Sequence, residues 1–119
     1  MEYKVMKEAW KEQITPSYVF DLDKLKERMD LVNSILKGKA TVCYAMKANP
    51  FLVGAMDAYT EKYEVCSPGE YEICYRQGIA PSKIVISGVN KTFASMERIM
   101  ELSKGEGIFT MESEEHFHI

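Results

Sequence analysis

The sequence contains no apolar run near the roughly 20 residues that span a bilayer, and its first fifteen residues carry charges throughout. A secretory signal needs an apolar core, so we expect neither a signal peptide nor a membrane anchor. Basic runs are also missing and the net charge is −3, which argues against binding to nucleic acid. The three cysteines are an odd number without a nearby histidine, which argues against a zinc site and predicts reduced core thiols in a cytoplasmic protein.

The feature that is present is an alternation of strand and helix patterns within one domain of 119 residues. Strand-type runs are expected at 41–46, 63–66, 84–87 and 108–111, with a helical pattern between each pair. Such alternation predicts an α/β fold with a parallel sheet. It fits the N-terminal half of a (β/α)₈ TIM barrel, whose full length is about 250 residues. An open doubly wound sheet is the rival, because periodicity alone does not separate the two.

Two helix starts are marked by capping residues. Ser67 is a natural N-cap, Pro68 fits the first helical position, and Glu70 completes a capping box. Ser113 is expected to cap a fifth helix that begins as the sequence ends. These signals place one helix directly after the second strand and another directly after the fourth.

The first 21 residues lie outside the alternating pattern. Residues 1–13 have the spacing of a short amphipathic helix. Residues 15–21 are expected to form one strand, because Pro16 disfavours helix and the three residues from Tyr18 to Phe20 favour sheet.

The chemistry concentrates around Lys47, at the end of the first expected strand. Side chains alternate along a strand, so Cys43, Ala45 and Lys47 share one face. Asn49-Pro50 marks a turn, at the end where active sites of parallel α/β folds collect. A partly desolvated lysine there would be available as a nucleophile. Taken alone, a lysine that merely reaches solvent at a strand end is the commoner explanation.

Four segments favour a functional role for Lys47: TPSYVFD (15–21), YAMKANP (44–50), YEVCSPGE (63–70) and ISGVNKT (86–92). In order and spacing they resemble motifs of the alanine-racemase-like (fold type III) pyridoxal-phosphate-dependent decarboxylases. The YAMKANP segment is similar to the motif of the cofactor lysine. The third and fourth segments are more similar to diaminopimelate decarboxylases than to ornithine decarboxylases or alanine racemases.

The resemblance implies that Lys47 binds pyridoxal 5′-phosphate covalently and acts in catalysis. It implies decarboxylation of an amino-acid substrate, meso-diaminopimelate to lysine, by a full-length protein that forms a homodimer. Glu64 stands where many members have Asp, near the cofactor lysine, and is the second catalytic candidate. A plain strand-end acid is an equal alternative for Glu64. Residues 1–21 are expected to join a C-terminal β-domain, and residues 22–119 to form the first half of the cofactor-binding barrel.

Other residues have structural alternatives. Glu70 matches a family glutamate, although its capping role alone would explain it. Asn90 and Lys91 line the site or form a solvated loop, and His116 and His118 are expected at the surface. Tyr44 and Met46 are on the strand face opposite to Lys47 and are expected in the core.

The family's glycine-rich phosphate loop and its substrate-binding residues lie farther along its chain than this sequence extends. We therefore expect a fragment that is inactive alone, or a half-protein that pairs with another chain. Two alternatives remain open. One is a non-catalytic half-barrel that binds a partner, and the other is a racemase or cofactor carrier with the same barrel and lysine.

Overall fold

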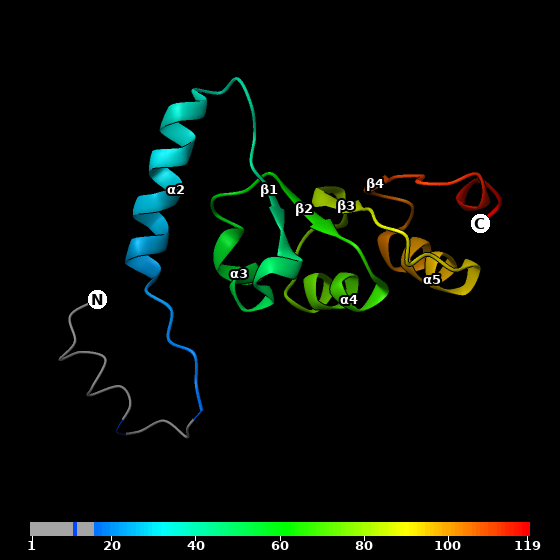
Figure 1. Ribbon diagram of the computed structural model, residues 1–119, viewed down its shortest axis with the longest axis horizontal. Helices are drawn as coiled ribbons and strands as arrows, with labels where there is room; N and C mark the ends of the chain where they lie inside the picture. The colour runs from blue at the N-terminus through cyan, green and yellow to red at the C-terminus, as the bar shows by residue number, and fades with distance from the viewer. Residues whose placement is uncertain (1–10, 12–15) are drawn as a thin grey trace. The chain divides into compact units, whose positions relative to one another are not determined.

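A computed structural model describes Lys11 and residues 16–119 (Figure 1). The chain divides into two compact units, Met1–Lys37 and Gly38–Ile119. The helix expected at 1–13 lies outside the described residues except for Lys11. In the first unit, helix α2 spans Leu22–Leu36, and its N-cap Asp21 accepts a hydrogen bond from the Lys24 N–H at 3.1 Å.

The expected strand at 15–21 is not formed by its described residues, 16–21. An isolated strand leaves its backbone groups without ladder partners and is unstable in water. Within the described part of the chain, every strand pairing involves residues of the second unit. The β propensity of Tyr18, Val19 and Phe20 is therefore not sufficient to form a strand here.

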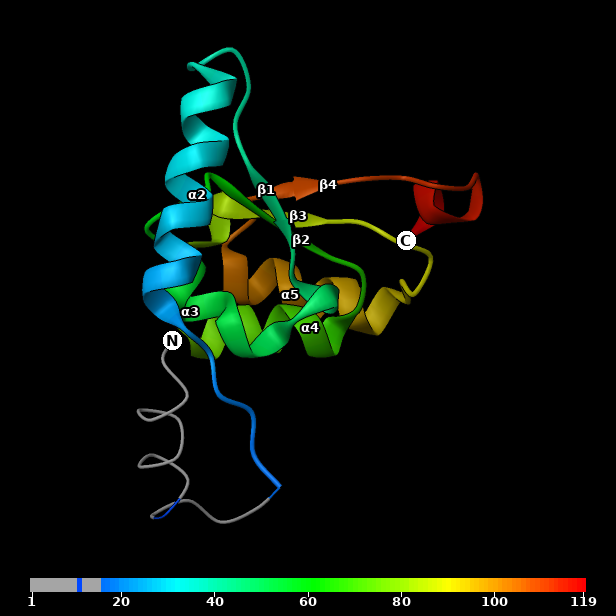
Figure 2. The same cartoon turned by 60° about the vertical axis from the view of Figure 1, so that its left-hand side comes forward.

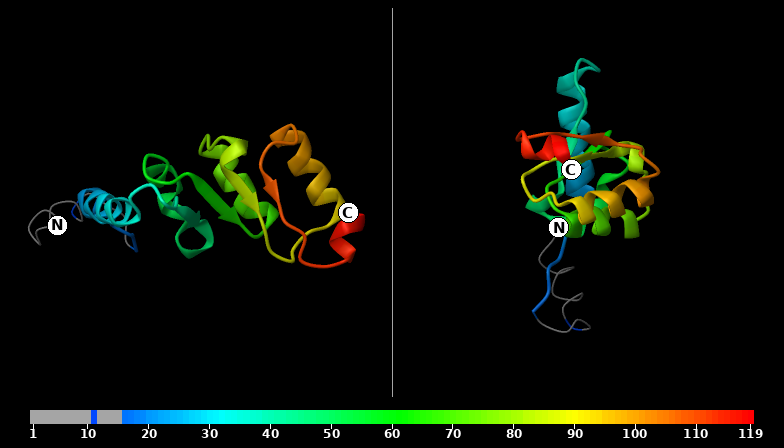
Figure 3. Two further views of the ribbon diagram at one scale, coloured as in Figure 1. Left: turned by 90° about the horizontal axis from the view of Figure 1, so that it is seen from above. Right: turned by 90° about the vertical axis from the view of Figure 1, so that its right-hand side faces the viewer.

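The second unit holds one sheet of four parallel strands: β1 (Cys43–Ala45), β2 (Lys62–Val65), β3 (Ile84–Ile86) and β4 (Ile108–Phe109). Their order across the sheet is β1-β2-β3-β4 (Figure 3), which confirms the predicted parallel α/β arrangement. The register aligns Ala45 with Glu64, Glu64 with Val85, and Val85 with Ile108. Side chains from all four strands therefore form rows across each face of the sheet.

The connecting helices settle which parallel fold is present. Helices α3 (Val53–Met56), α4 (Pro68–Arg76) and α5 (Phe93–Ser103) all lie on the same face of the sheet (Figure 2). A doubly wound sheet places its helices on both faces and reverses its strand order. Sequential parallel strands with every crossover helix on one face are instead the winding of a barrel. The unit is an unclosed half-barrel, as predicted, and the doubly wound rival is excluded.

The core lies between the sheet and these helices. Alternate residues of β2 and β3 face it, and the fully or nearly fully buried ones are Tyr63, Val65, Ile84 and Ile86. Burial of each such side chain contributes on the order of 1.5–3 kcal/mol. The Tyr63 hydroxyl donates to the Val53 carbonyl at 2.8 Å, which ties α3 to the sheet. The opposite face, called the open face below, carries Cys43, Ala45, Glu64, Val85 and Ile108, and no helix of the second unit covers it.

The predicted helix starts are partly confirmed. Ser67 is the N-cap of α4 and accepts from the Glu70 N–H at 3.3 Å, with Pro68 in the first turn. The expected capping box is only half formed, because the Glu70 carboxylate accepts from the Cys66 N–H at 2.7 Å and not from Ser67. The expected fifth helix is a 3₁₀ turn, η4 (Glu115–His118), whose N-cap is Glu114 and not Ser113 as expected. The Ser113 hydroxyl still accepts a hydrogen bond from the His116 N–H at 3.3 Å.

Among the described residues, no helix is long and apolar enough to cross a membrane.

Candidate functional site

Lys47 lies immediately after β1, in the 3₁₀ turn η1 (Met46–Ala48). Two neighbours hold this turn. The Met46 side chain is fully buried beneath the sheet, and the Tyr44 hydroxyl donates to the Asn49 carbonyl at 2.8 Å. The backbone of Lys47 is thus held on both sides. Its side chain is exposed and not partly desolvated as expected, because no element of the second unit covers the open face.

Four side chains form a connected row at the carboxyl ends of β1, β2 and β3. The Lys47 Nζ lies 3.6 Å from the Cys66 Sγ, and that sulfur lies 3.4 Å from the Ser87 Oγ. The Ser87 hydroxyl donates to the Glu64 Oε1 at 2.9 Å. We call Lys47, Cys66, Ser87 and Glu64 the strand-end row.

The structure brings Lys47 and Glu64 into this row without a direct contact between them. Cys66 and Ser87 lie between the amine and the carboxylate. No carboxylate in the described part of the chain forms a salt bridge with Lys47. The Lys47 amine is therefore available to a ligand, and Glu64 is connected to it only through the two intervening side chains.

Sequence reasoning missed the roles of Cys66 and Ser87. All three cysteines were expected in the core, but only Cys74 is buried, whereas Cys66 is half-buried and Cys43 is exposed. Apolar flanking residues indicate a strand but not which face each position takes. Cys66 follows Glu64 by two residues, and this period-two spacing is the signal that places both side chains on one face.

A second polar cluster lies at the ends of β3 and β4. The Lys91 Nζ donates to the Gly88 carbonyl at 2.7 Å and pairs with the Glu112 carboxylate. The other Glu112 oxygen accepts from Thr110 and from the Gly88 N–H. The Nδ1 of His116 lies 3.1 Å from the Glu112 Oε2. We call these residues the Glu112 cluster.

In the Glu112 cluster the Glu112 carboxylate is paired with the Lys91 ammonium. The Lys91 side chain is only 5% exposed and the His116 side chain 8%, so the expectation that His116 lies at the surface was wrong. His116 follows Ser113 by three residues, one turn of 3₁₀ helix, and this tight turn folds its ring back onto Glu112. The hydrogen bonds from Lys91 and Thr110 lower the pKa of Glu112 to about 2. Lys91 therefore binds within this cluster and does not join the strand-end row.

Gly88 separates the two groups. Its φ of +79° is in the left-handed region, and a Cβ at this position would lie 3.0 Å from the Cys66 carbonyl oxygen. The same residue supplies an N–H to Glu112 and a carbonyl to Lys91. Only glycine allows the backbone to turn here while it passes this close to Cys66.

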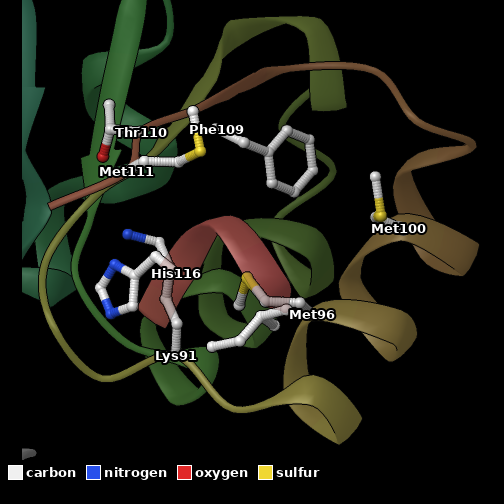
Figure 4. A pocket seen from close by; sticks show the side chains of 8 residues that line it. Lys91, Met96, Met100, Phe109, Thr110, Met111 and His116 are labelled. Atoms are coloured by element: carbon white, nitrogen blue, oxygen red, sulfur yellow. The ribbon is translucent and has the colours of Figure 1, made fainter. Parts of the chain in front are cut away.

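A cavity of about 340 Å³ lies beside the Glu112 cluster, between α5 and the segment that follows β4 (Figure 4). Its walls are mostly apolar and come from Met96, Met100, Phe109, Met111 and Ile119. Phe109 pairs with the buried Ile86, which places the cavity on the helix side of the sheet. The strand-end row faces the other side, so this cavity is not the space in front of Lys47.

The remaining residues considered from the sequence lie outside the strand-end row and the Glu112 cluster. Asn90 and His118 are exposed. Met46 is buried in the core as expected, and Tyr44 is half-buried. The Glu70 carboxylate is occupied by the Cys66 N–H, which supports its structural role at the start of α4.

Comparison with known proteins identifies the arrangement. Residues 22–119 match the family described as pyridoxal-dependent decarboxylase, pyridoxal binding domain. This chain belongs to the pyridoxal-dependent decarboxylases. It is 37% identical over 92 residues to a diaminopimelate decarboxylase of Helicobacter pylori, a match that covers 75% of this chain and 23% of the relative. The chain thus spans about a quarter of the length of the curated relatives it matches.

Two solved structures show the same decarboxylase fold. A lysine decarboxylase from Selenomonas ruminantium aligns with a TM-score of 0.80 at 26% identity, covering 99% of this chain and 32% of that chain. A diaminopimelate decarboxylase from Helicobacter pylori, complexed with L-lysine, aligns with a TM-score of 0.67 at 25% identity, covering 89% and 28%.

The strand-end row fits the cofactor that this decarboxylase family uses, pyridoxal 5′-phosphate. The Lys47 amine has no carboxylate partner among the described residues, and its neighbours on the open face are small: Ala45, Cys66 and Ser87. Small neighbours leave room for a planar ring. The seven glycines are spread along the chain and form no phosphate-binding cluster, so the residues present fit covalent attachment of the cofactor but supply no phosphate loop.

Proposed function

We propose that Lys47 carries pyridoxal 5′-phosphate in an enzyme that decarboxylates a diamino acid, converting meso-diaminopimelate to lysine. The observation that carries the proposal is the exposed amine at the carboxyl end of the first barrel strand, which has no carboxylate partner among the described residues. The names of the relatives support the reaction, since diaminopimelate decarboxylases recur among them. The L-lysine bound to the Helicobacter pylori structure supports the product.

The residues of this chain have distinct tasks in the proposed reaction. The Lys47 Nζ would hold the cofactor covalently at the carboxyl end of β1. Bound pyridoxal phosphate supplies an electron sink for the charge that remains when CO₂ departs. Glu64 accepts a hydrogen bond from the Ser87 hydroxyl, which positions Ser87 beside Cys66. Cys66 in turn accepts a hydrogen bond from the Lys47 amine and so positions that amine.

The proposal extends to the rest of the protein. The 119-residue chain alone is proposed to lack activity, because tight cofactor binding also needs backbone N–H groups around the phosphate. Residues 1–21 are proposed to join a C-terminal β-domain, and the full-length protein is proposed to be a homodimer. A cytoplasmic location is proposed because all three cysteines are unpaired.

The cofactor assignment is tested by reduction with borohydride. The full-length protein, loaded with pyridoxal phosphate, is reduced and digested, and the labelled peptide is identified by mass spectrometry. We expect the label on Lys47. Lys62, whose amine donates to the Ser82 carbonyl, is the internal control on the same sheet and should stay unlabelled. Label on any other lysine would contradict the assignment.

The reaction is tested by measuring CO₂ release and stereochemical inversion on a panel of diamino acids. We expect CO₂ release with the highest kcat/KM for meso-diaminopimelate. Inversion without CO₂ would support a racemase. Binding of cofactor with neither reaction would support a cofactor carrier.

A further inference from the structure

Cys66 and Lys47 form a thiol–amine pair that the proposed reaction does not require. The 3.6 Å between the Lys47 Nζ and the Cys66 Sγ is a contact distance, and the two atoms come from neighbouring strand ends. Cys66 is held in place, since its N–H donates to Glu70 and its sulfur lies 3.4 Å from the Ser87 hydroxyl. Lys47 is exposed, and rotation about its side-chain bonds can bring the amine closer to the sulfur.

The surroundings of Cys66 differ from those of the other two thiols. Reactive cysteines lie in electropositive and partly exposed positions. Cys66 is half-buried, contacts a lysine amine, and directly precedes the N-cap of α4. Burial raises the pKa of Cys74 to about 11, and burial with the nearby Glu64 charge raises the pKa of Cys43. Neither of these thiols has a lysine amine within hydrogen-bonding distance in the described part of the chain.

We infer that Cys66 and Lys47 form a reversible, peroxide-driven nitrogen–sulfur crosslink. In the first step the Cys66 sulfur attacks hydrogen peroxide, the O–O bond breaks, water leaves, and the sulfur is oxidised by two electrons to a sulfenic acid. In the second step the Lys47 nitrogen attacks that sulfur, and the S–O bond breaks. The departing oxygen takes the nitrogen's proton and leaves as a second water. The thiol, amine and peroxide thus become one sulfenamide and two waters.

The crosslink is reversible because an external thiol can attack its sulfur and release the Lys47 amine. A second external thiol then restores Cys66. The crosslink itself follows from the geometry of the pair. Its consequence rests on the proposed function, because a crosslinked Lys47 has no free amine for pyridoxal phosphate. Peroxide would therefore prevent cofactor loading, and a cellular thiol would permit it again.

The test treats the purified chain with hydrogen peroxide and maps its peptides by tandem mass spectrometry. We expect one linked pair of peptides, joined between Lys47 and Cys66, with a mass two hydrogen atoms below the sum of the unlinked peptides. Dithiothreitol should remove it. The variants Cys66→Ser and Lys47→Met should abolish it, whereas Cys43→Ser should retain it. Oxidation of Cys66 to a sulfinic acid with an unmodified Lys47, or a link through Cys43, would overturn the inference.

A second measurement separates this inference from the proposed function. Pyridoxal phosphate and borohydride are added to the reduced and to the peroxide-treated full-length protein, and the label on Lys47 is counted. We expect at least a severalfold loss of label after peroxide and recovery after dithiothreitol. If the crosslink forms but the reduced full-length protein carries its label on another lysine, the crosslink stands and the proposed cofactor lysine is wrong.

Discussion

Lys47 and Lys91 both follow strands of the same half-barrel, yet they are in opposite states. The Lys91 ammonium is 5% exposed and is bound by the Gly88 carbonyl and the Glu112 carboxylate. The Lys47 amine is exposed, and within the described part of the chain it hydrogen-bonds to the Cys66 thiol and forms no salt bridge. A lysine whose hydrogen bonds are already satisfied stabilises structure, whereas one without an acidic partner is available for chemistry. The comparison teaches that position at a strand end does not by itself define a catalytic lysine.

The largest expected effect is the loss of cofactor labelling and of activity when the Lys47 amine is removed. In the full-length protein Lys47→Ala should remove borohydride labelling and reduce CO₂ release to background, because no other amine occupies the strand-end row. The matched variant Lys62→Ala removes an amine bound to the Ser82 carbonyl and should retain labelling. Peptide mapping and a CO₂ assay measure both. Normal turnover by Lys47→Ala would break the comparison.

The next effect concerns Gly88, which contacts both regions. Gly88→Ala introduces a left-handed non-glycine residue, at a cost of about 1–2 kcal/mol, and also places its Cβ 3.0 Å from the Cys66 backbone. Gly105→Ala is the control, because Gly105 has a φ of +76° but nothing within 4 Å of a Cβ. We expect Gly88→Ala to lose the more free energy of unfolding in urea titrations. Equal losses would show that the approach to Cys66 is unimportant.

A smaller effect concerns the pH dependence of the free energy of unfolding, to which the Glu112 cluster contributes. The pKa of Glu112 is lowered from 4.5 to about 2, chiefly by the hydrogen bond from Lys91. A carboxyl group with a lowered pKa in the folded state contributes stability above its unfolded pKa and loses it as the pH falls. The free energy of unfolding should therefore decrease between about pH 4.5 and about pH 2, and Glu112→Gln should weaken that decrease.

The measurement is a series of urea titrations at several pH values. Glu106→Gln changes an exposed glutamate and is the control. An unchanged pH dependence in Glu112→Gln would contradict the role assigned to the cluster.

The smallest expected effect is within the strand-end row. Ser87→Ala removes the hydrogen bond to Glu64 and should cost about 1 kcal/mol of unfolding free energy. Ser82→Ala, at an exposed position, should cost close to nothing. Thermal and urea unfolding of both variants measure the difference. Equal stability of the two would show that the Ser87–Glu64 hydrogen bond does not hold the row together.

Much of the fold was predictable because it depends on local signals. The strand expected at 63–66 corresponds to β2, Met46 is buried in the core as expected, and Ser67 and Pro68 marked the start of α4. The strand predicted at 15–21 is not formed by residues 16–21, because strand formation requires a partner strand, which local propensity does not report. The burial of His116 was missed for a related reason, since its partner Glu112 is reached only by a tight turn.

The sequence by itself determined the parallel α/β class, the position of Lys47 at a strand end, and the resemblance that identified the family. These depend on the spacing and the type of residues, which can be taken directly from the sequence. Only the tertiary structure decided between a barrel and a doubly wound sheet, because that choice rests on which face the helices cover. It alone placed Cys66 and Ser87 between Lys47 and Glu64, and it bound Lys91 to Glu112. Contacts between separate strand ends depend on register and backbone turns, which no single segment of sequence specifies.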